Sequence, residues 1–303
     1  MKMTECRLCN AANKFQKVRS NFVYGGKKIH KFWECEKCSL VYLLPPLSES
    51  DEKKFYAKEF EKFMLKRSGS DRNWSGPEKH VKSNQDHVKR RWKFIKDYIN
   101  EGNSVLEIGC SSGFMLDDLR EKKMDVVGIE PSGGFGDFLS KNGHENYNSI
   151  NQFLDKNPNR RFDLIMHFFV FEHISNPIEF LEQQLYLLKP NGLIIAEVPN
   201  VDDPLTSLYN IPQFEKFYWS IAHHYYYNPK SVSCELKKLN CSNFEIKLDQ
   251  RYDLSNHIQW LNKGIPGGQE KYNHIFSQNT LESYKNNLIT SKHCDTFFMY
   301  IWK

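Results

Sequence analysis

The sequence lacks the features that would place it in a membrane or in an oxidising compartment. It has no uninterrupted apolar run of the roughly 18 residues that a membrane span needs. Its first residues, Met1–Cys6, carry no apolar core of the kind found in secretory signals. We therefore expect a cytoplasmic protein with no membrane partner. In a reducing compartment its eight cysteines are not expected to form a set of disulfides.

A strong excess of either charge is also missing. The chain has 42 Lys and Arg residues against 37 Asp and Glu residues, and its formal net charge of +5 is spread along the sequence. Dedicated nucleic-acid-binding proteins carry a clustered basic stripe instead. Internal repeats and low-complexity tracts are absent as well. We expect a globular monomer or homodimer without a nucleic-acid partner.

Four of the cysteines form two close pairs, Cys6–Cys9 and Cys35–Cys38, with two residues between the thiols of each pair. A C-x-x-C turn directs two thiolates at one tetrahedral ion, and a second such turn completes the shell. Between the pairs, the dipeptide Gly25–Gly26 predicts a hairpin turn with strands at 22–24 and 29–33. Two such turns joined by a hairpin describe a zinc ribbon. Four cysteine ligands leave no open position, so the predicted zinc is structural.

The whole chain is interpreted as three parts: the zinc ribbon at 1–46, a helical linker or lid at 47–100, and a main domain at 101–303. Strand and helix patterns alternate in the main domain, which predicts an α/β fold with a parallel sheet. A late insertion at about 252–294 interrupts this alternation. Helices are predicted at 85–99 and 177–188, and strands near 105–108, 126–130, 145–147, 163–168, 193–198, 244–248 and 296–302.

A glycine loop follows the first predicted strand of the main domain. Gly109 and Gly113 lie four residues apart, and Glu107 precedes them at the carboxyl edge of the sheet, where ligands bind in this architecture. Glu130 closes the next strand, where a carboxylate can accept hydrogen bonds from both ribose hydroxyls. The loop lacks the features of a phosphate-binding loop. A nucleoside without a pyrophosphate, such as S-adenosylmethionine (SAM), fits this combination.

Several motifs in fixed order resemble those of the class I SAM-dependent methyltransferases. They extend over roughly 100 residues and are Glu107–Gly113, Gly128–Ser132, Phe162–Ile165, Phe171–Ile174, Leu188–Gly192 and Glu197–Asn200. The resemblance implies a Rossmann-like sheet of seven strands whose last strand is antiparallel. It also implies SAM contacts, by side chain or backbone, at Glu107, Gly109, Cys110, Ser111, Gly113, Phe114, Glu130, Pro131, Ser132, His167 and Phe168.

A histidine and tyrosine cluster, His223–Tyr227, follows the last of these motifs and is expected to lie over the methyl group. Together with the zinc ribbon it resembles the zinc-containing methyltransferases of nucleotide-linked deoxysugars. Those enzymes have a Glu-His pair where this chain has Ala222 and His223, so O-, N- and C-methylation all stay open. We expect His223 as general base, His224 as the second choice and Tyr226 as a substrate contact. Packing over the pocket is the alternative role of this cluster.

The expected function is methyl transfer from SAM to a small molecule, a sugar or nucleotide-linked sugar of surface polysaccharide or secondary metabolism. An RNA base methyltransferase is one alternative, because some ribosomal-RNA guanine methyltransferases also place a four-cysteine zinc module before this fold. A non-catalytic SAM-binding scaffold subunit is another. The sequence alone does not identify the acceptor, the methylated atom or the role of the insertion.

Overall fold

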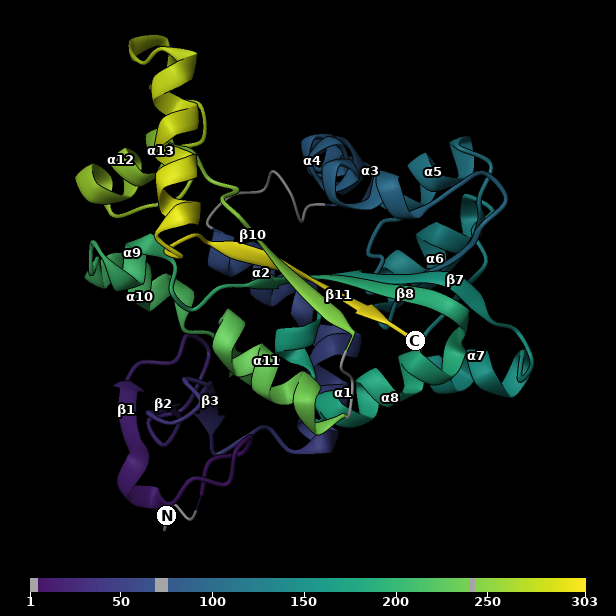
Figure 1. The fold of residues 1–303 in the computed structure, drawn as a ribbon, viewed down its shortest axis with the longest axis horizontal. Helices are drawn as coiled ribbons and strands as arrows, with labels where there is room; N and C mark the ends of the chain where they lie inside the picture. The colour runs from purple at the N-terminus through teal and green to yellow at the C-terminus, as the bar shows by residue number, and fades with distance from the viewer. Residues whose placement is uncertain (1–4, 69–75, 240–242) are drawn as a thin grey trace. The chain divides into compact units, whose positions relative to one another are not determined.

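A computed structural model describes residues 5–68, 76–239 and 243–303 (Figure 1). The contacts divide the chain into two compact units that are not continuous in sequence. The first unit contains 1–46, 171–175 and 197–299, and the second contains 47–170, 176–196 and 300–303. Each unit is described separately below. Within the described residues, no helix is both long and apolar enough to cross a membrane.

The first unit contains an antiparallel sheet of four strands in the order β1-β2-β3-β9. Its strands are β1 (Gln16–Ser20), β2 (Lys31–Cys35), β3 (Val41–Leu44) and β9 (Tyr225–Tyr226). Val41 pairs with Tyr226 and Tyr42 with Tyr225. The amino-terminal ribbon is therefore extended by a strand from the predicted histidine and tyrosine cluster, which lies about 180 residues later in the sequence.

The predicted position of the ribbon hairpin was wrong for its first strand. That strand is Gln16–Ser20, and residues 22–24 follow it outside the ladder. The Ser20 hydroxyl accepts the N–H of Phe22, and the N–H of Tyr24 donates to the carbonyl of Trp219, which draws this segment away from β2. Ile29 is also outside the sheet and is 65% exposed. Tyr24 therefore pairs with a segment that is distant in the sequence.

The central sheet has seven strands in the order β10-β11-β8-β7-β4-β5-β6. Their bounds are β4 Ser104–Ile108, β5 Asp125–Ile129, β6 Asn146–Tyr147, β7 Phe162–Phe168, β8 Leu188–Pro199, β10 Phe244–Asp249 and β11 Thr296–Trp302. β4 pairs in parallel with β5 and β7, and β5 with β6. The strand predicted near 145–147 is the two-residue β6.

The last strand runs antiparallel to β8. The N–H of Asn200, at the end of β8, donates to Asp295, just before β11. At the other end, the N–H of Lys303 donates to Gly192 within β8. The end of each strand thus lies beside the start of the other. The expected seven-stranded α/β fold with a reversed last strand is confirmed.

Helices precede and connect the strands. In the first half of the chain they are the turn η1 (Asn13–Phe15), α1 (Glu49–Lys54), the π-helical η2 (Phe55–Glu59), α2 (Phe60–Ser68), α3 (Pro77–Ser83), α4 (Gln85–Ile95), η3 (Lys96–Tyr98), α5 (Phe114–Glu121) and α6 (Gly133–Lys141). The helix predicted over 85–99 ends as α-helix at Ile95. The hydroxyl of Tyr300 donates to the carbonyl of Phe94 (3.0 Å), which satisfies one of the acceptors left at that end.

In the second half of the chain the helices are α7 (Ile150–Lys156), η4 (Phe171–His173), α8 (Pro177–Leu187), α9 (Pro204–Ser207), α10 (Pro212–Tyr218), α11 (Pro229–Lys238), α12 (Leu254–Lys263), η5 (Asn273–Ile275) and α13 (Gln278–Thr290). The late insertion is therefore mostly helical, and α12 and α13 contact each other (Figure 1). Asp253 caps the start of α12, and Gly264 ends it with a φ of 65°.

Candidate functional site

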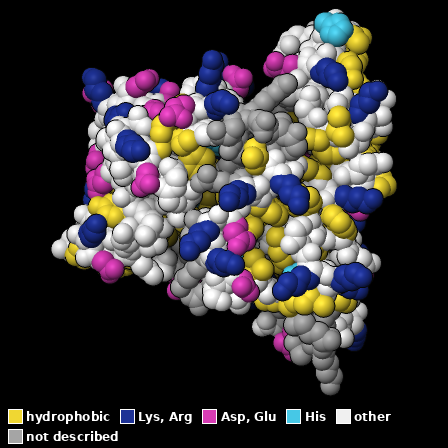
Figure 2. Space-filling model, turned by 180° about the vertical axis from the view of Figure 1, so that it is seen from behind, with side chains coloured by type: hydrophobic (Ala, Val, Ile, Leu, Met, Phe, Trp, Pro, Cys, Tyr) yellow, Lys and Arg dark blue, Asp and Glu magenta, His cyan; other side chains and the backbone are white. Residues whose placement is uncertain are grey.

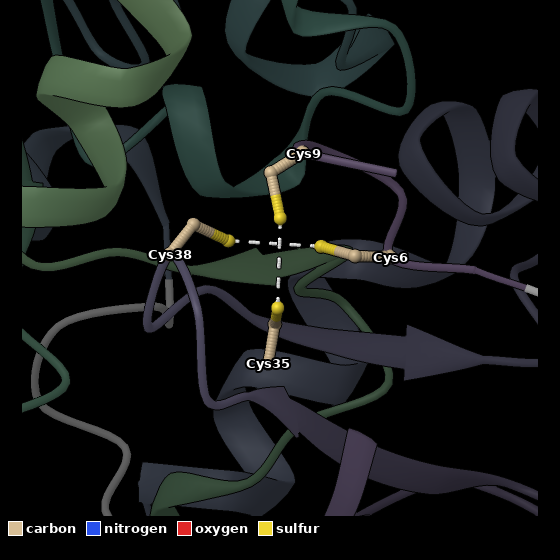
Figure 3. Close-up of side chains that lie close together, drawn as sticks. All are labelled: Cys6, Cys9, Cys35 and Cys38. Carbon is tan, nitrogen blue, oxygen red and sulfur yellow. Dashed lines mark hydrogen bonds between the residues drawn. The ribbon is translucent and has the colours of Figure 1, made fainter. Parts of the chain in front are cut away.

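The two cysteine pairs adopt the same local turn. Cys6 and Cys35 each accept, through their carbonyl, the N–H of the residue four positions later, Asn10 and Ser39. Asn10 and Ser39 both have left-handed backbone angles, with φ of 57° and 64°. These turns point each pair of thiols toward the other pair, as Figure 3 shows. The sequence prediction of a converging set of four cysteines is confirmed.

The spacing of the four sulfur atoms fits a tetrahedral ion. Cys6 Sγ lies 3.6 Å from Cys38 Sγ, and Cys9 Sγ lies 3.6 Å from Cys35 Sγ. A zinc–sulfur bond of about 2.3 Å places the corners of a tetrahedron roughly 3.8 Å apart. Gln16 Nε2 approaches Cys35 Sγ at 3.6 Å, an interaction suited to stabilising a negative sulfur. The four thiols can therefore hold one zinc ion.

In the second unit, the glycine loop after β4 is shaped by backbone conformation and by close packing. Gly109 has a φ of +71°, and a Cβ atom there would lie 2.5 Å from Val170 Cγ2. Gly113 has a φ of +78°, and its Cβ would lie 2.6 Å from Leu139 Cδ2. Both positions therefore require glycine. The N–H of Gly113 donates to the carbonyl of Cys110, and this bond closes the loop before α5 begins.

Glu130 joins this loop to the next one. Glu130 Oε2 accepts the N–H of Ser111 (2.7 Å), and Oε1 accepts the N–H of Ser132 (2.8 Å). The carboxylate is therefore held in one orientation beside the glycine loop and is only 7% exposed. A carboxylate can accept about four hydrogen bonds. Its remaining capacity suits a ligand with two neighbouring hydroxyl groups, such as a ribose.

Glu107 is the strongest sign that this loop binds a ligand. Its side chain is 2% exposed, and Oε2 has no hydrogen-bond partner within the described residues. Burial raises the pKa of Glu107 to about 8; the charge of Arg91 opposes this shift and that of Glu130 adds to it. A buried carboxyl oxygen without a partner is costly. Donor groups of a bound SAM would remove this cost, so the residues present fit the expected cofactor.

Two residues from the preceding helices complete the surroundings of the loop, and the sequence analysis did not identify them. His80 of α3 approaches the Ser112 hydroxyl through Nδ1 at 2.8 Å, and its ring is 5.7 Å from that of Phe114. Burial, with a smaller effect of the nearby Arg91 charge, lowers the pKa of His80 to about 4, so this imidazole is neutral at pH 7. Arg91 of α4 lies with its Cζ 4.0 Å from the ring centre of Phe168.

Other residues assigned to the cofactor from sequence point into the core. The Cys110 side chain packs in a buried cluster with Leu116 and Leu139, so only its backbone faces the loop. His167 is fully buried against Phe180, with ring centres 5.3 Å apart, and burial lowers its pKa to about 3. Their side chains thus support the strand ends.

In the first unit, Glu172, His173 and His223 gather their titratable atoms within 4.8 Å of one another. His173 Nδ1 is 2.7 Å from the carbonyl oxygen of Ala222, so Nδ1 carries the proton. The other nitrogen of His173, Nε2, lies 3.9 Å from Glu172 Oε1. The rings of His173 and His223 are 4.6 Å apart and nearly perpendicular. This spacing allows the three groups to share a proton or to ligate an ion.

The neighbours of His223 in sequence have different surroundings. His224 is completely buried, its N–H donates to the carbonyl of Glu172, and its carbonyl accepts from Leu43 of the ribbon. The hydroxyl of Tyr226 donates to Tyr218 and accepts the N–H of Ser220. The ring of Tyr226 lies 4.7 Å from that of His223. Of the three residues predicted as catalytic, His223 is the one in the titratable group.

Comparisons with known proteins relate the chain to methyltransferases. It is 28% identical over 103 residues to a ubiquinone biosynthesis O-methyltransferase from Bradyrhizobium diazoefficiens, an alignment covering 33% of this chain and 41% of that protein. It is 32% identical over 115 residues to a tRNA U34 carboxymethyltransferase from Pseudoalteromonas translucida, covering 35% and 36%. The chain therefore spans well under half the length of these curated relatives.

A solved structure has the same fold. The SAM-dependent methyltransferase from Archaeoglobus fulgidus superposes with a TM-score of 0.51 at 19% identity, covering 81% of this chain and all of that one. Residues 80–246, more than half of the chain, match the family described as the methyltransferase domain, and this range begins at His80 and contains both the glycine loop and His223. The chain therefore belongs to the methyltransferase domain family.

Proposed function

We propose that the protein transfers the methyl group of SAM to a small-molecule acceptor. In this reaction the sulfur–methyl bond breaks as the acceptor atom bonds to the methyl carbon, and S-adenosylhomocysteine leaves. The family match supports this proposal, and the buried Glu107 carboxyl beside the oriented Glu130 is the single observation that carries the cofactor assignment. In this assignment the loop residues Gly109–Gly113 hold the cofactor, and Glu130 binds its ribose.

An acceptor hydroxyl or carbon acid must also lose its proton, and we assign His223 as the general base. The proton moves from the acceptor atom to an imidazole nitrogen of His223. An ionised Glu172 carboxylate favours a positive charge there, because its oxygen and the imidazole nitrogen of His223 lie within 4.8 Å of each other. Since the hydroxyl of Tyr226 is bonded to the backbone, we place Tyr226 as a positioning residue for the His223 ring. His224 remains the second candidate.

We further propose that the acceptor is a sugar or a nucleotide-linked sugar, and that the four thiolates hold one structural zinc. The combination of a four-cysteine ribbon with the histidine and tyrosine segment supports both, and β3 pairs directly with β9 of that segment. An RNA acceptor is less well supported. On the face shown in Figure 2, the basic side chains are interspersed with acidic and apolar ones instead of forming one stripe.

The proposal is tested by incubating the protein and SAM with nucleotide-linked sugars, free sugars and total RNA, and measuring S-adenosylhomocysteine. Product is expected in the sugar samples. Product only in the RNA samples, together with an RNA affinity that falls steeply with salt, would support the RNA alternative. SAM binding without product in any sample would favour a scaffold role. A co-crystal with S-adenosylhomocysteine would then show the shape of the acceptor site.

Replacing Glu130 by alanine is expected to weaken SAM binding by about tenfold to a hundredfold or more. A hydrogen bond to a charged group contributes about 1.5–3 kcal/mol, and the variant would also release the N–H groups of Ser111 and Ser132. Isothermal titration calorimetry measures the change. The exposed Glu121 at the end of α5 provides the control variant Glu121→Ala. Wild-type affinity in Glu130→Ala would refute the ribose assignment.

A further inference from the structure

A polar cavity in the first unit is not explained by the cofactor loop or by the His223 group. Its volume is about 430 Å³, and three segments far apart in the sequence form its walls. The ribbon sheet contributes Arg19 and Glu34, the segment after β8 contributes Asp202 and Asn210, and Asn228 precedes α11. Charged groups and amides thus dominate a hollow that is large enough for a small molecule.

The charges of the walls decide which ligand chemistry fits. Arg19 Nε lies 4.0 Å from Glu34 Oε2, and Asp202 Oδ2 accepts from Asn228 Nδ2 at 3.1 Å. Glu34 is also paired with Lys17, whose Nζ lies 3.5 Å from Glu34 Oε1, so the carboxylates of the lining are matched by nearby cations and the near balance of charge suits an uncharged ligand. The cation of Lys230 lies at the rim, where it donates to Ser39. Carboxylates, amides and a guanidinium together offer donors and acceptors for adjacent hydroxyl groups.

The late insertion holds one wall of this cavity. Ser207, which lines the cavity, lies with its hydroxyl 3.0 Å from His293 Nδ1 of the insertion. Nearby, the Tyr209 hydroxyl is 2.7 Å from that of Tyr284 in α13, which in turn meets His257 Nδ1 of α12 at 2.5 Å. Burial lowers the pKa of His257 to about 4, so this imidazole is neutral at pH 7. The insertion therefore supports the segment 207–209, which forms part of the cavity wall.

Aromatic rings connect the cavity to the proposed base. Arg19 Cζ lies 5.6 Å from the ring centre of Trp219, Trp219 lies 4.8 Å from Tyr226, and Tyr226 lies 4.7 Å from His223. All of these residues belong to the first unit. Three successive contacts thus separate the cavity wall from His223, and an acceptor that occupies both places would have to extend around the buried rings of Trp219 and Tyr226.

We propose that this cavity binds an uncharged, hydroxyl-rich saccharide portion of the acceptor. The inference rests on the proposed sugar-class methyl transfer and assigns one part of the acceptor to a site of its own. Asp202 and Glu34 accept hydrogen bonds from sugar hydroxyls, Asn210 and Asn228 pair with further hydroxyls, and the insertion keeps the wall in place. Binding energy from this remote part would orient the atom to be methylated.

Saturation-transfer-difference NMR tests the proposal on the whole protein. The probes are D-glucose, D-galactose, D-mannose, L-rhamnose and N-acetyl-D-glucosamine, each measured separately. We expect at least one of them to receive saturation, and its affinity to fall about tenfold or more in Asp202→Ala and in Asn210→Ala. The side chain of Asn210 is exposed and donates to the carbonyl of Leu208; because its backbone is left-handed, with a φ of 49°, the thermal midpoint of Asn210→Ala is measured to check that this variant folds. Asp155→Ala, on the exposed face of α7, is the control.

Three results would overturn the proposal. They are the absence of saturation for all five sugars, saturation that is unchanged in both cavity variants, and binding of inorganic pyrophosphate that both variants abolish. SAM binding and methyl transfer are measured on the same samples. Saccharide binding that depends on Asp202 without any methyl transfer would contradict the proposed function and support the cavity. Methyl transfer to a sugar that neither variant affects would support the proposed function and contradict the role of the cavity.

Discussion

Replacement of His223 by alanine is expected to lower the turnover number by about 10²- to 10⁴-fold, the range that a general base contributes. The His223 side chain is only 8% exposed, and its ring lies against those of His173 and Tyr226. Alanine leaves the acceptor proton without an imidazole to receive it. SAM affinity is expected to stay unchanged, because the residues assigned to SAM are a separate set. Steady-state assays with an acceptor that yields S-adenosylhomocysteine in the incubation experiment measure turnover, and calorimetry measures SAM binding.

Three other variants sharpen the interpretation of this experiment. His274→Ala removes an exposed histidine of the same unit and should leave turnover unchanged. His173→Ala should reduce turnover less than His223→Ala and shift the pH profile, because His173 acts on the acceptor only through His223. His224→Ala should mainly lower thermal stability, since that side chain is completely buried. Turnover of His223→Ala within about threefold of wild type would remove His223 as the base.

The strands of the central sheet could be predicted from sequence because their signals are local, whereas the seven-stranded arrangement with a reversed last strand was implied by the family resemblance. Val105, Leu106 and Ile108 are all buried in a strand that pairs in parallel on both sides, so this segment is an apolar run interrupted only by Glu107. The strand β6 has only two residues, and such a short segment carries almost no pattern. The ribbon hairpin was misplaced because Tyr24 pairs with Trp219 and Ser220 and not with β2. Pairing across two hundred residues leaves no trace in a local pattern.

The candidate sites also contain residues that local sequence patterns predict and residues that only tertiary packing brings together. Gly109, Gly113 and Glu130 were found because a strand followed by a glycine loop fixes their positions along the chain. His80 and Arg91 were missed because they come from helices whose approach to the loop depends on tertiary packing. The only local signal was the start of a helix at Pro77, three residues before His80. The cluster of Glu172, His173 and His223 was likewise missed, because it brings together segments about 50 residues apart in the sequence.

Removal of the proposed zinc ion, or replacement of Cys35 by serine, is expected to lower the thermal midpoint by about 10 °C or more. Structural zinc contributes about 10–16 kcal/mol to the folding of isolated zinc-finger peptides. A loss of even about 5 kcal/mol corresponds to roughly 10 °C for a protein of this size. Cys35 is fully buried in β2, which pairs with β1 and β3. Calorimetry on chelator-treated protein, and metal analysis before treatment, measure the effect; one zinc per chain is expected.

Loss of the metal should also disturb the position of the proposed base His223, because the ribbon and the His223 segment share one sheet. β3 pairs with β9, and the N–H of Leu43 donates to the carbonyl of His224. Loss of the metal should therefore lower turnover together with stability, while Cys234→Ser, which changes a cysteine outside the cluster, should alter neither. A metal-free protein with an unchanged thermal midpoint would contradict the zinc assignment. Restored turnover on adding zinc back would show that turnover depends on the metal, as the shared sheet predicts.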